Sequence, residues 1–300
     1  MKILFYGGYG WLATYIIDEF KRLNHEIIIS NNRIEPNNKD IIENEIIDIN
    51  PDRVFCCLGR TSGFNKETNT YINNIDYLET NLKENMNDNL YSPLLLGFIC
   101  NKLNIHLSYM GTGCIFSENT NDIEKINKYK EEDNPNFFGS SYSIVKGYTD
   151  ILMKQYMNVL NIRIRMPIIK EKNNKNFITK IFAYKKICSY PNSMTYLPDM
   201  IPIIVDLCIN QKNGTYNCVN KGYISHKNIF DIYNNNIVKN NEYQKHIYEL
   251  INENELNNIL KSKRSNNVLD TTKLEKEYNI RDINECINEC INYMIETSNL

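Results

Sequence analysis

The segment that most constrains the fold of this chain is a strand, a glycine turn and a helix at its N-terminus. Residues 2–7 (KILFYG) are continuous and apolar, as in a buried parallel strand. Gly7, Gly10 and Ala13 follow at a spacing that keeps the backbone slim where the helix starts. The N-terminus of a helix suits anionic phosphates. The segment therefore predicts a nucleotide-binding α/β sheet, with a plain tight turn as the alternative.

The rest of the N-terminal half alternates apolar strands with helices. Strands are expected at 26–30, 53–59, 105–109 and 159–166, and helices at 91–102 and 140–156. This order predicts an α/β fold with a Rossmann-type, doubly wound parallel sheet. Residues 65–89 are polar and are expected to form a helical or looped excursion over the site, and 117–135 a surface loop.

Beyond Pro167 the pattern becomes less regular. Helices are expected at 177–186, 200–210 and 284–296, a strand at 214–220 and an Asn-rich loop at 234–241. Ser225 is expected to cap a helix, with His226 at the surface. We predict a nucleotide-binding Rossmann domain at 1–166, to which 198–222 return, and a smaller, mainly substrate-binding C-terminal lobe at 167–300.

Composition excludes several classes of function. The 300 residues carry a net charge of −2 without a basic segment, so nucleic-acid binding has no electrostatic footprint. No stretch approaches the ~20 apolar residues of a membrane span, and glycines and Asp18-Glu19 interrupt the apolar N-terminus. A soluble, cytoplasmic protein is expected. The nine cysteines form no disulfide pattern, and Cys286 and Cys290 lack the partners of a metal site.

Two short segments carry the chemistry. Tyr142 and Lys146 stand four residues apart and would share one face of a helix. A nearby ammonium lowers a phenol pKa from its usual ~10, which makes Tyr142 a candidate proton donor to a carbonyl being reduced. Thr112 offers a second hydroxyl. Cys114 is unexpected in a plain reductase and is either a second acid or a packed strand cysteine.

The end of the second strand bears on the cofactor. NAD sites usually place an acidic residue there for the ribose hydroxyl. Here the sequence is Ser30-Asn31-Asn32-Arg33, with no acid before Glu35. Arg33 is suited to a 2′-phosphate, which favours NADPH over NADH. The alternative is that Arg33 is simply an exposed, solvated side chain.

In this order, Gly7-x-x-Gly10-x-x-Ala13, Thr112 and Tyr142-x-x-x-Lys146 resemble an extended short-chain dehydrogenase/reductase. Longer segments narrow the resemblance to the bifunctional UDP-4-keto-6-deoxy-glucose 3,5-epimerase/4-reductases, relatives of dTDP-4-dehydrorhamnose reductase. These segments are NPNFFGSSYSIVK at 134–146, RIRMP at 163–167, NFITKI at 176–181, PNSMT at 191–195 and RSNNVLDTTKL at 264–274. The similarity runs nearly end to end and is weakest at 35–50, 117–130 and 234–260.

The resemblance implies a role for three groups of residues. Those expected to contact the cofactor are Gly7, Gly10, Trp11, Leu12, Arg33, Leu58, Gly59, Thr61, Tyr142 and Lys146. Those expected to be catalytic are Thr112, Tyr142 and Lys146 for reduction, with Cys114 and Lys180 as the epimerisation pair. Those expected to hold the nucleotide-sugar are Asn176, Arg264 and Asn266, while Asn89 matches a structural asparagine of the family.

The reaction implied by the resemblance is 3,5-epimerisation of UDP-4-keto-6-deoxy-D-glucose, followed by NADPH-dependent reduction at C4 to UDP-L-rhamnose. Cys114 would act as an acid and Lys180 as a base on opposite faces of the sugar. Tyr142 would then protonate the C4 alkoxide. Gly113-Cys114 stands where sugar-nucleotide 4,6-dehydratases carry Asp-Glu, so dehydratase activity is not expected.

Three other functions remain open at this stage. The chain could be a 4-keto-sugar reductase without epimerase activity, a non-catalytic NADP-binding regulatory subunit of the same fold, or a C4 epimerase with permanently bound NAD. The sugar could be linked to dTDP instead of UDP. Short-chain reductases commonly pair through the helix that bears the Tyr and the Lys, so a homodimer is expected.

Overall fold

The computed structural model describes residues 1–118, 122, 125–237 and 244–297. Its centre is a six-stranded sheet in the order β12-β8-β6-β3-β1-β2, in which every neighbouring pair is parallel. The strands are β1 (Lys2–Tyr6), β2 (Glu26–Ile29), β3 (Arg53–Cys56), β6 (His106–Thr112), β8 (Val159–Ile164) and β12 (Gly214–Asn217). The predicted Rossmann-type sheet is confirmed.

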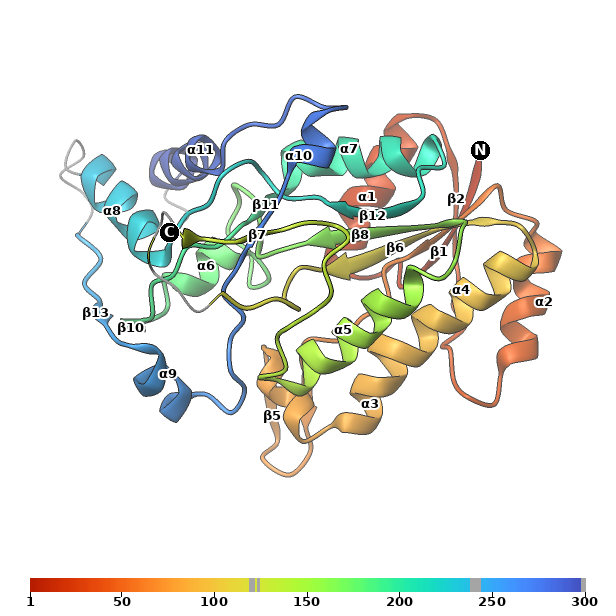
Figure 1. Ribbon diagram of the computed structural model, residues 1–300, viewed down its shortest axis with the longest axis horizontal. Helices are drawn as coiled ribbons and strands as arrows, with labels where there is room; N and C mark the ends of the chain where they lie inside the picture. The colour runs from red at the N-terminus through yellow and green to blue at the C-terminus, as the bar shows by residue number, and fades with distance from the viewer. Residues whose placement is uncertain (119–121, 123–124, 238–243, 298–300) are drawn as a thin grey trace.

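Helices cover both faces of this sheet (Figure 1). Those on one face are α1 (Trp11–Arg22) and α7 (Leu197–Ile209), and those on the other are α2 (Lys39–Ile49), α4 (Ser92–Lys102) and α5 (Ser141–Met153). Successive residues of a strand face opposite sides, so Phe5 packs under α1 while Leu4 and Tyr6 pack under α2 and α4. The sequence pattern did not predict α2.

The excursion between β3 and α4 contains more strand than expected. It comprises a hairpin of β4 (Gly63–Asn65) and β5 (Thr70–Ile72), followed by η1 (Ile75–Glu79), α3 (Leu82–Met86) and η2 (Asn87–Tyr91). A Cβ on Gly63 would lie only 2.3 Å from the Tyr77 ring, so the hairpin packs tightly on η1. On its other side, η1 contacts the helix α5.

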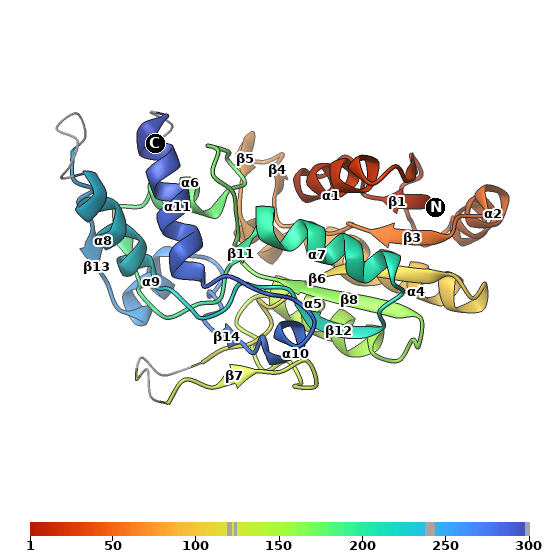
Figure 2. The same cartoon turned by 90° about the horizontal axis from the view of Figure 1, so that it is seen from above.

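The smaller lobe lies beyond the carboxyl ends of the sheet strands (Figures 1 and 2). Its helices are α6 (Phe177–Ile181), α8 (His226–Asn236), α9 (Glu253–Ile259) and α11 (Ile283–Glu296). The short helix α10 (Thr272–Glu275) instead contacts β12, and its Leu274 joins the core of the central sheet. Its two-stranded pairs are β9 (Pro167–Ile168) with β11 (Thr195–Tyr196), β10 (Lys186–Ile187) with β13 (Glu249–Leu250), and β7 (Lys128–Tyr129) with β14 (Val268–Leu269). A separate apolar core joins α6, α8 and α11.

Three local predictions beyond β6 were wrong. The helix expected at 177–186 ends at Ile181, because Lys186 and Ile187 pair with β13 instead. The segment expected as a surface loop contains β7, whose Tyr129 is buried and stacks on Phe116. The first part of the expected loop 234–241 belongs to α8, and 238–241 lie outside the described residues.

Membrane-spanning helices, disulfides and metal clusters were not expected from the sequence, and the described residues bear on each. None of their helices is long and apolar enough to cross a membrane. The nine cysteines are free thiols. No cluster of three or more metal-ligating side chains occurs among the residues that are described.

A buried ion pair fastens α5 to the sheet. Arg163 on β8 is fully buried and donates from Nε and Nη2 to the two carboxylate oxygens of Asp150 on α5, at 2.9 and 2.7 Å. Asn161, on the same strand, donates to Asp150 Oδ1 at 2.7 Å. Since α5 begins with the segment that carries Tyr142 and Lys146, this pair fixes the helix that presents them.

Replacing Asp150 with Asn should strongly destabilise the fold. The substitution leaves the Arg163 guanidinium buried without a counter-charge, which typically costs about 3–5 kcal/mol. Denaturant unfolding followed by circular dichroism measures the change. Glu249→Gln, in the exposed pair with Lys186, is the control and should leave the unfolding midpoint unchanged. A loss for Asp150→Asn no greater than for this control would contradict the assignment.

Candidate active site

The glycine turn connects β1 to α1 and packs against the residues that follow β3. Gly7 has a φ of +78°, and a Cβ there would lie 2.9 Å from the carbonyl carbon of Cys57 and 3.0 Å from the Leu58 nitrogen. Only glycine tolerates both the conformation and the contact. The Gly10 nitrogen donates to the Gly7 carbonyl at 3.1 Å, and Gly10 is the N-cap of α1. Trp11 and Leu12 therefore occupy the first turn of α1, beside the predicted pyrophosphate position.

Asn89 fixes the segment that follows β3. Its side chain is fully buried, accepts from the Arg60 nitrogen at 3.0 Å and donates to the Arg60 carbonyl at 2.9 Å. A Cβ on Gly59 would meet the Asn89 amide oxygen at 3.3 Å. The loop carrying Leu58, Gly59 and Thr61 is thus held by side-chain hydrogen bonds beside the glycine turn.

Arg33 lies just beyond β2 and is already engaged by carboxylates. Its guanidinium is paired with Glu35 at 2.7 Å and with Asp88 at 2.8 Å, and its side chain is half exposed. Asp88 also pairs with Arg60 at 2.6 Å. Two arginines therefore share one carboxylate at this edge of the sheet, and a bound phosphate would have to compete with Asp88 for Arg33.

Thr112 and Tyr142 are brought together at the carboxyl end of β6. Each is 8% exposed, and their hydroxyls are hydrogen-bonded. The Thr112 hydroxyl also accepts from the Cys114 nitrogen at 3.1 Å. Tyr142 lies in the first turn of α5, whose N-cap Ser140 accepts from the Ser143 nitrogen at 3.1 Å. The cap fixes where the helix begins and hence where the phenol points.

Lys146 does not act on Tyr142 as the sequence led us to expect. Its ammonium donates to the Tyr109 hydroxyl, and more weakly to the Met110 carbonyl at 3.4 Å. Burial and the neighbouring Cys114 side chain raise the pKa of Tyr142, and the hydrogen bond from Thr112 only partly offsets them. The expectation of a lowered phenol pKa was wrong, because desolvation of a wholly buried phenol outweighs the other influences.

Cys114 lies between the reductase hydroxyls and a buried arginine. The half-buried thiol packs against the apolar cluster of Tyr77, Leu78 and Tyr142. Nη1 of Arg165 lies 3.5 Å from the Cys114 sulfur. Arg165 lies within the segment RIRMP at 163–167 and was not predicted as a site residue. A charged residue inside the strand expected at 159–166, where it would need buried polar partners, was the available signal.

Lys180, the expected partner of Cys114, lies in the last turn of α6. Burial and the neighbouring Lys175 charge lower the pKa of Lys180. Lys175 is itself held by the excursion, since it donates to Ser62 at 3.2 Å and to Asn73 at 3.3 Å. No direct contact joins Lys180 to Cys114 within the described part of the chain, so their pairing remains a prediction.

The three predicted sugar-nucleotide residues differ in their surroundings. Asn176 is fully buried as the N-cap of α6 and donates to the carbonyls of Ile169 and Glu171, both at 2.9 Å. Arg264 pairs with Asp76 of η1 at 3.0 Å, which ties the smaller lobe to the excursion. The Asn266 amide oxygen accepts from the Asn192 side-chain nitrogen at 3.1 Å. A substrate role for each remains a prediction.

His226 is more enclosed than the sequence indicated. Ser225 caps α8 as expected, accepting from the Asn228 nitrogen at 3.2 Å. The His226 ring lies 5.3 Å from that of Phe177, and its Nε2 is buried. Burial and the Arg165 charge lower the pKa of His226 to about 4. The prediction of a surface histidine was therefore wrong: the ring is half-buried, and it is neutral at physiological pH.

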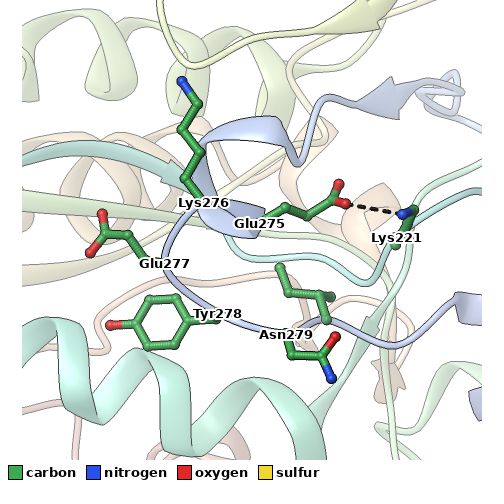
Figure 3. A pocket seen from close by; sticks show the side chains of 7 residues that line it. Lys221, Glu275, Lys276, Glu277, Tyr278 and Asn279 are labelled. Atoms are coloured by element: carbon green, nitrogen blue, oxygen red, sulfur yellow. Dashed lines mark ion pairs between the residues drawn. The ribbon is translucent and has the colours of Figure 1, made fainter.

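A separate surface pocket lies along the segment between α10 and α11. Its volume is about 330 Å³, and it is open and mostly polar. The residues that line it are Lys221, Glu275, Lys276, Glu277, Tyr278, Asn279 and Ile280 (Figure 3). Lys221 and Glu275 form an ion pair at 3.2 Å across one side. The pocket shares no residue with the catalytic cluster.

The fold and this cluster define a class of protein. A parallel Rossmann sheet that opens with a glycine turn, and that brings a Thr, a Tyr and a Lys together beside the carboxyl end of a central strand, is the framework of a short-chain reductase. The comparisons with known proteins narrow this class.

No family model matches the chain. The crystal structure of the UDP-rhamnose synthase from Acanthamoeba polyphaga mimivirus is 43% identical, with a TM-score of 0.88 over 98% of this chain and 99% of that one. The bifunctional dTDP-4-dehydrorhamnose 3,5-epimerase/dTDP-4-dehydrorhamnose reductase of Arabidopsis thaliana is 32% identical over 92% of this chain and 87% of its own length. The chain therefore belongs to the family of these rhamnose-synthesis enzymes.

More distant structures share the fold. The dTDP-4-dehydrorhamnose reductase of Bacillus anthracis, solved in complex with NADP, is 17% identical, with a TM-score of 0.72 over 98% of this chain and 99% of that one. At this identity the likeness shows the fold alone. It agrees with the parallel sheet order and the flanking helices described above.

Lys146 should titrate far below an ordinary lysine. Burial lowers the pKa of Lys146 to about 8, against ~10.4 in the unfolded chain. Between these values only the unfolded state binds the proton, so this group makes stability rise with pH across that window. NMR of isotope-labelled, methylated lysines, with Lys146→Arg to assign the signal, measures the titration. A midpoint near that of the surface lysines would contradict the buried environment.

Proposed function

We propose that this chain converts UDP-4-keto-6-deoxy-D-glucose to UDP-L-rhamnose, by epimerisation at C3 and C5 followed by NADPH-dependent reduction at C4. The observation that carries the proposal is the position of Cys114, whose thiol packs in the cluster that contains Tyr142 and whose nitrogen donates to the Thr112 hydroxyl. A plain reductase has no use for a second proton-transfer group there. The named activities of the 43% and 32% identical relatives support the same reaction.

The residues around the glycine turn fit a dinucleotide. Gly7 and Gly10 leave the backbone slim at the N-terminus of α1, where a pyrophosphate finds free N–H groups. Arg33, with no acid at the end of β2, favours the 2′-phosphate of NADPH over NADH. The distant reductase solved with NADP supports this choice. When bound, NADPH supplies the hydride that C4 of the sugar receives.

Epimerisation would precede reduction. The 4-keto group acidifies the hydrogens at C3 and C5, and each inversion needs a base on one face of the ring and an acid on the other. Cys114 and Lys180 are assigned to these two roles. The lowered pKa of Lys180 suits a base near neutrality, because more of the amine is unprotonated than in an exposed lysine.

Reduction would use the hydroxyl cluster. The raised pKa of Tyr142 keeps the phenol protonated at neutral pH, which suits a proton donor to the alkoxide formed at C4. The Thr112 hydroxyl would bond the same oxygen. Lys146, with its lowered pKa, would hold the nicotinamide ribose while it remains protonated.

The binding partner proposed for the site is a nucleotide-sugar, linked to UDP and less favourably to dTDP. Arg264 and Asn266 would contact it, whereas Asn176 would act by fixing the start of α6. We also propose a homodimer that pairs through α4 and α5. Their exposed faces carry Phe98, Tyr148 and Leu152, which are large apolar side chains at 45, 55 and 43% exposure.

The direct test is to incubate the protein with UDP-4-keto-6-deoxy-D-glucose and NADPH and to identify the sugar by NMR. UDP-L-rhamnose as product supports the proposal. UDP-6-deoxy-D-glucose or its C4 epimer would reduce it to a 4-keto reductase. Binding of NADPH without turnover would leave a regulatory subunit.

Two substitutions should separate the half-reactions. Cys114→Ala should abolish solvent-deuterium incorporation at C3 and C5, because one face of the sugar loses its proton-transfer group. Tyr142→Phe should retain incorporation and lower NADPH oxidation by about 10²- to 10⁴-fold, the usual contribution of a general acid. Mass spectrometry and absorbance measure the two effects. Each variant is the control for the other, and unchanged incorporation in Cys114→Ala would exclude its assigned role.

A further inference from the structure

Arg165 places a charged group, its guanidinium, in direct contact with Cys114. It follows β8 and is 1% exposed. Its Nη1 lies 3.5 Å from the Cys114 sulfur and donates to the Gly113 carbonyl at 3.3 Å and to the Ser265 hydroxyl at 3.0 Å. Its Nη2 donates to the Ser265 carbonyl at 2.7 Å and to the Asn192 amide oxygen.

No carboxylate is paired with this guanidinium among the described residues. Arg163, two residues earlier and on β8 itself, shows the usual arrangement, because Asp150 neutralises it. A buried charge without a counter-ion is costly. The contacts of Arg165 are carbonyl, hydroxyl and amide oxygens and one thiol. Of these groups only the thiol of Cys114 can become an anion.

We propose that Arg165 is a positioning residue for Cys114, whose guanidinium stabilises the thiolate form of that side chain during epimerisation. The proposal rests on the proposed function. Whether Cys114 first gives or first takes a proton, its thiolate occurs once in each inversion. A guanidinium stays charged throughout and exchanges no proton with the sugar, so it can stabilise that anion without competing for the acid–base role.

The surroundings of Arg165 hold the guanidinium in place. Ser265 donates from its hydroxyl to the Phe116 carbonyl at 2.6 Å. The Asn192 oxygen that accepts from Arg165 also accepts from the Asn267 nitrogen at 3.1 Å. The segment 264–267 therefore clamps the planar group against the turn that carries Cys114. A lysine would retain the charge and lose the fork of donors that fixes its direction.

The nearby titratable groups do not replace this role. His226, which feels the charge of Arg165, is neutral above about pH 4. Tyr142 remains protonated because its pKa is raised, and Lys146 donates to Tyr109 rather than to the thiol. The guanidinium of Arg165 is therefore the cation in direct contact with the sulfur.

The test measures the reactivity of Cys114 itself, because the thiolate is the form that is alkylated. Iodoacetamide labelling at neutral pH, read by peptide mass spectrometry, compares Cys114 with Cys57. Cys57 is half-buried, and its pKa is raised by burial. Arg165→Gln should slow labelling of Cys114 relative to Cys57 by roughly tenfold or more, since one contacting charge is lost. Labelling of Cys114 at the wild-type rate would overturn the proposal.

Two further variants keep the result interpretable if Arg165→Gln folds poorly. Arg165→Lys should label faster than Arg165→Gln and slower than wild type, because charge remains without direction. Arg53→Lys is the control, because this partly buried arginine at the start of β3 donates to the Cys208 and Ile209 carbonyls and does not contact the Cys114 turn. It should label Cys114 as wild type does. Equal labelling in Arg53→Lys and Arg165→Lys, both slowed, would mean that a general loss of packing is responsible and would also overturn the proposal.

Deuterium exchange then connects the thiol to the reaction. In Arg165→Gln, incorporation at C3 and C5 should fall more than reduction of a substrate that is already epimerised. If the wild-type protein incorporates no deuterium, the proposed function fails, while the labelling result still decides the contact between Arg165 and Cys114. If incorporation is normal in Arg165→Gln, the positioning role fails and the proposed function stands.

Discussion

The site depends on the attachment of α5 to the sheet. The buried Asp150–Arg163 pair holds this helix against β8, and Thr149 donates from its hydroxyl to the Asn89 carbonyl at 2.6 Å. The same helix carries Tyr142 beside Thr112 and Lys146 beside Tyr109. A small rotation of α5 would separate the two hydroxyls, so the geometry of the reductase centre is set by an ion pair that touches neither of them.

Burial decides the protonation states around this helix. Desolvation raises the pKa of Tyr142 and lowers that of Lys146, so the two pKa values, which are ordinarily nearly equal, move apart. The phenol is therefore a donor and not a phenolate at neutral pH. The same effect neutralises His226, which leaves Arg165 as the buried cation next to Cys114.

Strand and helix alternation was readable from the sequence because a parallel sheet buried on both faces requires continuous apolar strands, and a dinucleotide turn requires Gly7. The central strands and α1, α4 and α5 were found within a few residues. Two of the missed elements share a cause. The strands β7 and β10 are two residues long and exist only through pairing with β14 and β13, from distant parts of the chain. Such pairing leaves no periodic signal.

By itself the sequence determined the Rossmann framework and singled out the candidate reacting groups, because spacing places Tyr142 and Lys146 on one helical face and the glycines at one turn. The tertiary structure alone decided which groups meet. It directed Lys146 to Tyr109, buried Asn176 as a helix cap, and brought Arg165, Asn192 and Ser265 around the Cys114 turn. These contacts join residues up to 100 positions apart, and their energies depend on burial, which no local pattern encodes.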